Sequence, residues 1–228
     1  MTVACVDVAF TTADAREADV TIVIDVLRAT STIVQALDAG YRRVLCADGL
    51  DRARGLAGPG RVLAGERHCV RPADFDLGNS PAETIGPRGD ELILATTNGA
   101  PAIVRAADLS PVVLIACLLN LDAVVEAADG DDVQLLCSGT DARPALEDVY
   151  VAGRIAERLG GRRSDSALVA LAVARGYARG RDALAASADA QVLGAAGLEA
   201  DIDWCARESV VASVPRLRSS GDGVAVVA

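Results

Sequence analysis

The segment 20–40, VTIVIDVLRATSTIVQALDAG, decides the fold. Residues 20–24 are apolar or β-branched throughout, which is typical of a strand that is buried on both faces of a sheet. From Thr30 onward the apolar residues recur with helical spacing, and Gly40 is a helix stop signal. A buried strand that passes directly into a helix is the repeating unit of α/β folds.

The same alternation continues along the rest of the chain. Further strands are predicted at residues 3–10, 44–47, 61–64, 92–95, 112–117, 133–137, 210–214 and 224–227. Helices are predicted at 50–56, 101–107, 121–128 and 146–159, with an Ala-rich helical stretch from 161 to about 190. Asn120 and Ser164 stand where N-caps belong. We therefore predict a single layered α/β/α domain over residues 1–228, with a largely parallel or mixed sheet.

Three polar turns follow predicted strands. They are DVLRATS at 25–31, TTNG at 96–99 and CSGTD at 137–141. Because parallel strands present their carboxyl ends to one edge of a sheet, we expect these turns to converge on one crevice. Helix N-termini at that crevice favour an anion. The turns therefore predict a site for a metal ion together with a phosphorylated or otherwise acidic molecule.

Asp25 is the first candidate at this site. A carboxylate at the end of a buried strand is costly unless it is paired or coordinated, so magnesium, an arginine or a helix N-terminus must compensate it. Arg28 is three residues away, and a simple ion pair between the two is the alternative explanation. The other turns are also rich in oxygen, which favours a functional role for Asp25.

Further oxygen ligands come from the segments after the next strand. Glu66 ends that strand, and the long loop at 68–90 supplies Asp76 and Asn79. Loops of this length inside a domain are more often functional than idle, although Asp and Asn are also ordinary turn residues. Magnesium takes only one or two protein carboxylates, so not all of these side chains can be direct ligands.

Two other patterns offer alternative chemistry. Thr97, Asn98 and Gly99 form either an oxyanion cradle at a helix start or an ordinary cap. His68, the only histidine, is either a general acid or a surface residue.

Cys137 and Arg143 have the spacing found in cysteine-dependent phosphatases. The match is flawed, because those enzymes resemble one another in flanking histidine, glycine and hydroxyl residues, where this chain has Leu136, Thr140 and Pro144. A cysteine nucleophile is therefore the less favoured reading of this segment.

Composition excludes several classes of function. The net charge is −10 and only 3% of residues are aromatic, which argues against binding to nucleic acid. All 22 cationic residues are arginine, so lysine-dependent chemistry is excluded. The longest apolar run, 112–119, is too short for a membrane span, no signal peptide is evident at residues 1–10, and no cysteine pair has C-x-x-C spacing. A cytoplasmic protein is the expectation.

Several blocks resemble the 2-phosphosulfolactate phosphatase family, over a region from about Val20 to Trp204. They are VIDVLRAT at 23–30, GER at 65–67, FDLGNSP at 75–81, TTNG at 96–99, and CSGT at 137–140 with Glu147 and Asp148. The resemblance implies an α/β fold and magnesium-dependent hydrolysis of a phosphate monoester on a sulfonated lactate, a step toward coenzyme M. Its partner is then a small phosphorylated acid, and a homodimer is compatible with it.

The resemblance also implies roles for individual residues. The metal ligands would be Asp25, Glu66 and Asp76, and the catalytic residues Asp25, Arg28, Glu66 and Glu147. The substrate contacts would be Arg28, Thr30, Asn79, Thr97, Asn98, Gly99, Ser138 and Thr140. Which carboxylate ligates and which activates water is left open.

One departure from the family stands near the end of the chain. The family usually shows Ser-x-His-Gly, whereas this chain has SADA at 187–190. Either water or Asp25 would attack phosphorus, and a phosphoaspartate route of the haloacid dehalogenase kind is disfavoured because lysine and an Asp-x-Asp pair are missing. A related phosphatase with another substrate, or a non-catalytic protein that binds an acidic metabolite, is the alternative.

Overall fold

The computed structural model describes residues 3–228, and its strands form two sheets. The first sheet has five parallel strands in the order β6-β2-β7-β1-β8. Their bounds are β1 Cys5–Ala9, β2 Val20–Ile24, β6 Val112–Ala116, β7 Asp132–Cys137 and β8 Arg162–Arg163. Strand β2, between β6 and β7, is buried along its whole length, as its apolar sequence predicts.

The second sheet has the order β4-β5-β3-β10-β9. Strands β3, β4 and β5 are parallel, whereas β10 pairs antiparallel with both of its neighbours. The bounds are β3 Arg43–Ala47, β4 Arg61–Gly65, β5 Glu91–Ala95, β9 Leu217–Gly221 and β10 Val224–Val227. The end of the chain thus completes a sheet that begins near residue 43.

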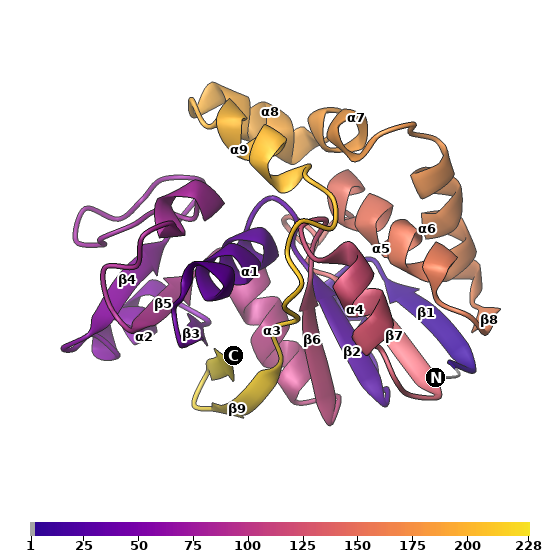
Figure 1. The fold of residues 1–228 in the computed structure, drawn as a ribbon, viewed down its shortest axis with the longest axis horizontal. Coiled ribbons are helices and arrows are strands. Elements are labelled where there is room, and N and C mark those ends of the chain that lie inside the picture. The colour runs from indigo at the N-terminus through magenta and orange to yellow at the C-terminus, as the bar shows by residue number, and fades with distance from the viewer. Residues whose placement is uncertain (1–2) are drawn as a thin grey trace.

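The helices cover both sheets, and two of them lie between the sheets (Figure 1). Helices α1 and α3 share one apolar cluster with both sheets, in which Ile33 and Ile103 pack with Val23 of the first sheet and Leu92 of the second. Helices α4, α5 and α6 cover the other face of the first sheet, and α2 covers the outer face of the second. The helical bounds are α1 Ala29–Ala39, α2 Leu50–Gly55, α3 Gly99–Ala107, α4 Leu121–Ala127, α5 Leu146–Arg158 and α6 Asp165–Arg175.

Three further helices lie together above the strand ends in Figure 1. They are α7 Gly180–Ala185, α8 Ala188–Ala195 and α9 Glu199–Cys205. Single 3₁₀ turns, η1 Thr12–Asp14 and η2 Pro81–Thr84, complete the regular structure of the described residues. Helix α9 packs on η2, which lies in the loop at 68–90. This contact connects the helices at 180–205 to that loop.

The α/β prediction is confirmed, with two differences of detail. The strands belong to two sheets rather than one, because α1 and α3 present apolar residues to both sides. Residues 210–214 are not a strand: Val210 and Val211 bond to the carbonyl of Leu119 as an irregular segment, and the polar residues of β9 form the edge strand instead.

The two cap predictions have different outcomes. Ser164 caps α6 by accepting a hydrogen bond from the N–H of Ala167 at 3.2 Å. Asn120 precedes α4, but its side chain accepts from the N–H of Cys117 at 3.0 Å and does not cap the helix.

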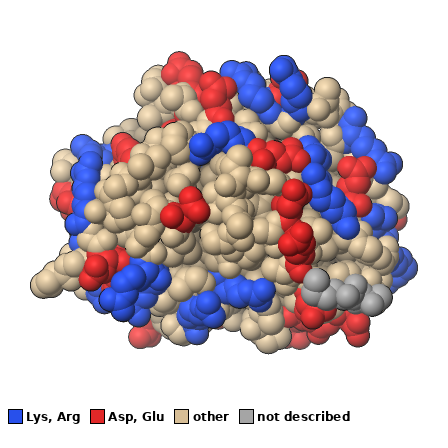
Figure 2. Space-filling view, in the orientation of Figure 1, with Lys and Arg blue, Asp and Glu red and all other residues tan. Residues whose placement is uncertain are grey.

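The described part of the chain contains no helix that is both long and apolar enough to cross a bilayer. On the face shown in Figure 2, acidic and basic side chains are interspersed rather than separated into large patches. This mixed surface provides no continuous basic track on that face for a nucleic acid backbone.

Candidate active site

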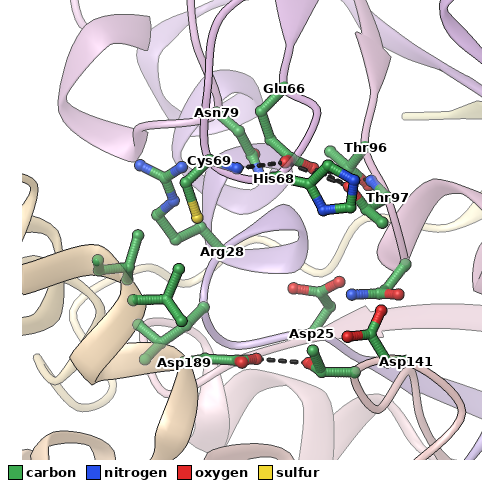
Figure 3. Close-up of a pocket in the computed structure, with 15 residues that line it drawn as sticks. Asp25, Arg28, Glu66, His68, Cys69, Asn79, Thr96, Thr97, Asp141 and Asp189 are labelled. Atoms are coloured by element: carbon green, nitrogen blue, oxygen red, sulfur yellow. Dashed lines mark hydrogen bonds between the residues drawn. The ribbon is translucent and has the colours of Figure 1, made fainter. Parts of the chain in front are cut away.

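A cavity of about 180 Å³ lies where strand ends of the two sheets meet. It receives residues that follow β2 and β7 of the first sheet and β4 and β5 of the second. The three polar turns therefore converge, although they do so between two sheets and not along the edge of one. The lining residues, most of them labelled in Figure 3, are Asp25, Leu27, Arg28, Glu66, His68, Cys69, Asn79, Thr96, Thr97, Asn98, Thr140, Asp141, Asp189, Val192 and Leu193.

Asp25 is held rigidly at the base of this cavity. Its Oδ1 accepts a hydrogen bond from the N–H of Ala29 at 2.9 Å, at the start of α1. The hydroxyl of Thr30 donates to the Asp25 carbonyl at 2.8 Å. Burial raises the pKa of Asp25 to about 6, and the charges of Glu66 and Asp189 act in the same direction. The carboxylate is thus fixed in place and destabilised as an anion.

Glu66 joins the turn after β4 to the turn after β5. Its Oε1 accepts from the N–H of Thr97 at 2.8 Å and from the Thr97 hydroxyl at 3.0 Å. Its Oε2 accepts from the N–H of Cys69 at 2.9 Å. Figure 3 shows these bonds along the upper wall of the cavity. Glu66 therefore adds negative charge to the cavity while it fixes the wall around Thr97.

Arg28 is the one arginine of the lining. Its guanidinium is buried, and Nη1 donates to Asp201 of α9 at 2.5 Å. Because Asp201 balances this charge, the four carboxylates of the lining have no free cation opposite them within the described residues. They are Asp25, Glu66, Asp141 and Asp189.

Two further polar side chains complete the lining, Asn79 and Thr140. The Oδ1 atom of Asn79 is buried and has no hydrogen-bond partner in the described residues, so an oxygen acceptor is left for a ligand. The hydroxyl of Thr140, in the turn after β7, donates to Asp189 Oδ2 of α8 at 2.5 Å.

A profile of the family described as 2-phosphosulpholactate phosphatase matches residues 8–220. The chain belongs to the 2-phosphosulpholactate phosphatase family. It is 40% identical over 209 residues to a probable 2-phosphosulfolactate phosphatase of Thermus thermophilus, with 88% of each chain covered. It is 37% identical over 220 residues to one of Deinococcus radiodurans, with 92% of each chain covered. A 2-phosphosulfolactate phosphatase of Methanothermobacter thermautotrophicus is 33% identical over 199 residues, with 86% of each chain covered.

Six of the residues that the sequence predicts for the site of this family member lie together in the cavity. They are Asp25, Arg28, Glu66, Asn79, Thr97 and Asn98, and a seventh predicted residue, Thr140, reaches the cavity from the turn after β7. Thr30, Gly99 and Ser138 lie behind the lining: Thr30 is bonded to the backbone of Asp25, Gly99 packs against Asp25, and the Ser138 hydroxyl donates to Asp148 at 3.1 Å. These three residues support the turns instead of facing the cavity.

The structure does not bring Asp76 to the cavity. Its side chain is exposed, and Oδ2 accepts from the N–H of Leu63 at 2.9 Å on β4. Side chains alternate in direction along an extended segment, and the neighbours Phe75 and Leu77 are the buried ones here. Asp76 thus stabilises the strand edge and lies outside the proposed metal site.

Glu147 faces a second cavity that adjoins the first at Thr140, Asp141 and Asp189. Its Oε2 is buried without a partner among the described residues. Burial raises the pKa of Glu147 to about 10, and the neighbouring Asp148 and Asp189 carboxylates act in the same direction. These surroundings favour the neutral form of Glu147, and the side chain does not line the first cavity.

The sequence patterns assigned no site role to Asp148, Asp189 or Asp201. Asp148 accepts from the N–H of Val26 at 2.9 Å and from that of Gly139 at 3.2 Å, so it ties the turns after β2 and β7 together. Asp189 lies in the SADA segment that departs from the family pattern, and its departure was the available signal. Asp201 carried no signal, because its partner Arg28 is 173 residues away in the chain.

Cys137 cannot serve as a thiolate nucleophile. It is fully buried at the end of β7, and burial raises its pKa well above the usual range, with Asp148 and Glu147 adding to the effect. It also does not line the cavity. The geometry therefore argues against the cysteine-phosphatase reading of residues 137–143: Thr140 and Asp141 of this segment line the cavity, whereas Cys137 is buried behind it.

The donor set of the first cavity fits magnesium. The carboxylate of Asp25 and the unpartnered carbonyl oxygen of Asn79 are hard oxygen donors, and a cation would offset the desolvation of Asp25. Among residues 3–228, no group of three or more His, Cys, Asp or Glu side chains is arranged as a metal site. A magnesium ion here would therefore rely on few protein ligands and on oxygen atoms of the substrate.

Gly99 leaves the space that the Asp25 carboxylate occupies. A Cβ atom at residue 99 would lie 2.4 Å from Asp25 Oδ2 and 2.4 Å from the Cβ of Ala29. We expect Gly99→Ala to lower kcat/KM by about 100-fold, because it displaces Asp25 by a sizeable fraction of an ångström. The overpacking should also lower the free energy of unfolding by roughly 1–3 kcal/mol.

Steady-state kinetics and urea unfolding measure both effects of the Gly99 substitution. Gly58→Ala is the matched control, because nothing lies within 4 Å of a Cβ atom there. A Gly99→Ala protein with unchanged activity would show that the position of Asp25 is not critical.

Proposed function

We propose that this chain is a magnesium-dependent phosphoric monoester hydrolase that converts 2-phosphosulfolactate to sulfolactate and phosphate. The cavity geometry supports this proposal: a buried, uncompensated Asp25 and a buried Arg28 line one small cavity, in a chain of the phosphosulfolactate phosphatase family. The negative lining by itself would repel a phosphate monoester, so a bound cation is required for binding.

The metal would be held by Asp25 and Asn79, with Glu66 contributing charge from the wall. When bound, magnesium neutralises charge on the phosphoryl oxygens and polarises the phosphorus centre. The side chains of the cavity do not supply this positive charge themselves.

The remaining steps belong to residues of the chain. Arg28 binds phosphoryl oxygen atoms and stabilises the charge that spreads over them during transfer. The N-terminus of α3, next to Thr97 and Asn98, favours the second acidic group of the substrate. Val192 and Leu193 of α8 restrict the entry of bulk water from the opposite side. Either a water molecule or Asp25 attacks phosphorus, the ester P–O bond breaks, and the leaving alkoxide takes up the proton that the attacking water releases. If Asp25 attacks, the leaving alkoxide is protonated from solvent, and a water molecule then hydrolyses the aspartyl phosphate to release inorganic phosphate and restore the carboxylate.

The proposal is tested by phosphate release. The purified protein is incubated with 2-phosphosulfolactate, 2-phospholactate and 2-phosphoglycerate in magnesium buffer, and inorganic phosphate is measured. We expect kcat/KM to be highest for the sulfonated ester and turnover to stop in EDTA. Tight binding of the esters without phosphate release would favour a non-catalytic metabolite-binding protein, and preference for another ester would favour a related phosphatase.

Metal binding should also depend on pH in a direction set by Asp25. Its pKa of about 6 in the folded protein is above the usual 3.8, so its contribution to stability is fully present below pH 3.8 and is lost as pH rises through 6. Magnesium offsets this loss only where Asp25 is charged. We expect saturating magnesium to raise Tm by about 5 °C at pH 7.5 and by much less at pH 5.

Differential scanning fluorimetry of the metal-free protein, with and without magnesium, measures this shift. Calcium and potassium chloride at matched ionic strength separate specific binding from general screening. Equal magnesium shifts at both pH values would contradict the assignment of Asp25 as a ligand.

A further inference from the structure

A chain of buried polar contacts links Arg28 to two distant segments. Asp201 Oδ2 accepts from Arg28 Nη1 at 2.5 Å, and Asp201 Oδ1 accepts from the hydroxyl of Ser80 at 2.6 Å. The side chains of Arg28 and Asp201 are only 4% and 5% exposed. Three segments thus meet at this ion pair: the turn after β2, the residue before η2, and α9.

The contact uses only part of the guanidinium. Nη1 is the one Arg28 nitrogen that bonds to another side chain within residues 3–228. An arginine carries five N–H donors in a planar fork, so most of them are left for a ligand. Because Arg28 lines the cavity whereas Asp201 and Ser80 do not, the two partners hold the guanidinium from the side away from the cavity.

The energetics favour a positioning role over a purely structural one. A buried ion pair gains little net stability, because the loss of hydration of both ions offsets their attraction. Its benefit is a fixed orientation, which is useful where a donor must meet developing charge without rearrangement. Elsewhere on α9, Asp203 pairs with Arg181 at the surface, where the side chains are 66% and 52% exposed and nothing is oriented toward a cavity.

We propose that Asp201 and Ser80 are positioning residues that orient Arg28 so that its free N–H groups face a phosphoryl group in the cavity. The inference rests on the proposed function only in naming a phosphoryl group as the anion. Asp201 fixes the direction of the fork through Nη1, and Ser80 fixes Asp201.

The experiment measures binding of inorganic phosphate, in magnesium buffer, to variants of the full chain. Asp201→Asn keeps the shape of the side chain but removes its charge. We expect its Kd for phosphate to rise by about 10- to 100-fold, and Ser80→Ala to raise it by about threefold. Asp203→Asn, in the same helix, is the matched control and should leave the Kd unchanged.

A double-mutant cycle separates positioning from a general structural effect. In an Arg28→Ala background, Asp201→Asn should cause no further loss of phosphate affinity, because Asp201 acts only through Arg28. Thermal unfolding of each variant is recorded. If Asp201→Asn is unstable, Ser80→Ala, which removes only one hydroxyl, tests the same contact instead. With substrate esters, the loss should appear in KM and kcat of Asp201→Asn but not of Asp203→Asn.

Three results would overturn the inference. The first is an unchanged Kd for phosphate in folded Asp201→Asn or Ser80→Ala. The second is that Asp201→Asn lowers phosphate affinity by the same factor in the wild-type and Arg28→Ala backgrounds. The third is a wild-type chain that does not bind phosphate. Phosphate binding requires no turnover, so this outcome is independent of hydrolysis. A chain that binds phosphate through Asp201 yet hydrolyses no ester would refute the proposed function and retain the inference.

Discussion

Asp25→Asn is expected to lower kcat/KM by about 1,000-fold or more while it leaves the protein at least as stable as the wild type. Asparagine retains an oxygen that accepts the hydrogen bond from Ala29, so the turn after β2 is preserved. What is lost is the buried negative charge, which the proposed metal site needs but which is unfavourable without a metal. Activity and stability should therefore move in opposite directions.

This opposition distinguishes a functional carboxylate from a structural one. It is measured by phosphate release and by Tm of the metal-free protein at pH 7.5. Asp38→Asn, an exposed position near the end of α1, is the control and should change neither quantity. A variant that loses activity and stability together would indicate that Asp25 serves the fold, and full activity would exclude it from the site.

Arg28→Ala should have the second large effect, a loss of about 1,000-fold in kcat/KM. It removes the charge that faces the transferred group, and it also leaves Asp201 buried without its ion partner. That unpaired charge should lower the free energy of unfolding by roughly 3–5 kcal/mol. A second variant is therefore needed to separate catalysis from folding.

Arg28→Lys provides that separation. Lysine keeps the positive charge and can pair with Asp201, but it lacks the planar fork that would serve Asp201 and a phosphoryl group together. We expect a loss of about 100-fold in kcat/KM with little change in Tm. The control is Arg181→Lys, at the exposed pair with Asp203. Wild-type kinetics in Arg28→Lys would show that the fork geometry is irrelevant.

The sequence predicted the local units well, because the signals for them are local. A five-residue apolar run followed by helical periodicity predicts β2 and α1 directly, and the polar turn between them is recognisable without any tertiary information. Parallel strand direction explains why the turns after β2 and β7 lie together, whereas the turn after β5 belongs to the other sheet and reaches the cavity through the packing of both sheets on α1 and α3.

What the sequence did not predict depends on long-range packing. Two sheets form instead of one because α1 and α3 are apolar on two sides, and periodicity alone does not reveal the second partner. The irregular segment at 210–214 has the composition of a strand, but its N–H groups bond to residue 119.

Individual site residues show the same limit. Asp25 and Asp76 both stand next to apolar residues in the sequence. Asp25 lines the cavity, whereas Asp76 accepts a hydrogen bond from the N–H of Leu63 at the surface. Asp201 became part of the site only through a contact with Arg28 that no local pattern encodes.

The helices between the two sheets have a consequence for substrate choice. Ile33 and Ile103 are buried in the apolar layer between the two sheets, so we expect their volume to affect the separation of the sheets that flank the cavity. Exchanging them for smaller or larger residues would narrow or widen the cleft without touching a single lining side chain. If the proposed function holds, the size of the acid that is accepted is expected to depend on this buried layer as well as on the lining residues.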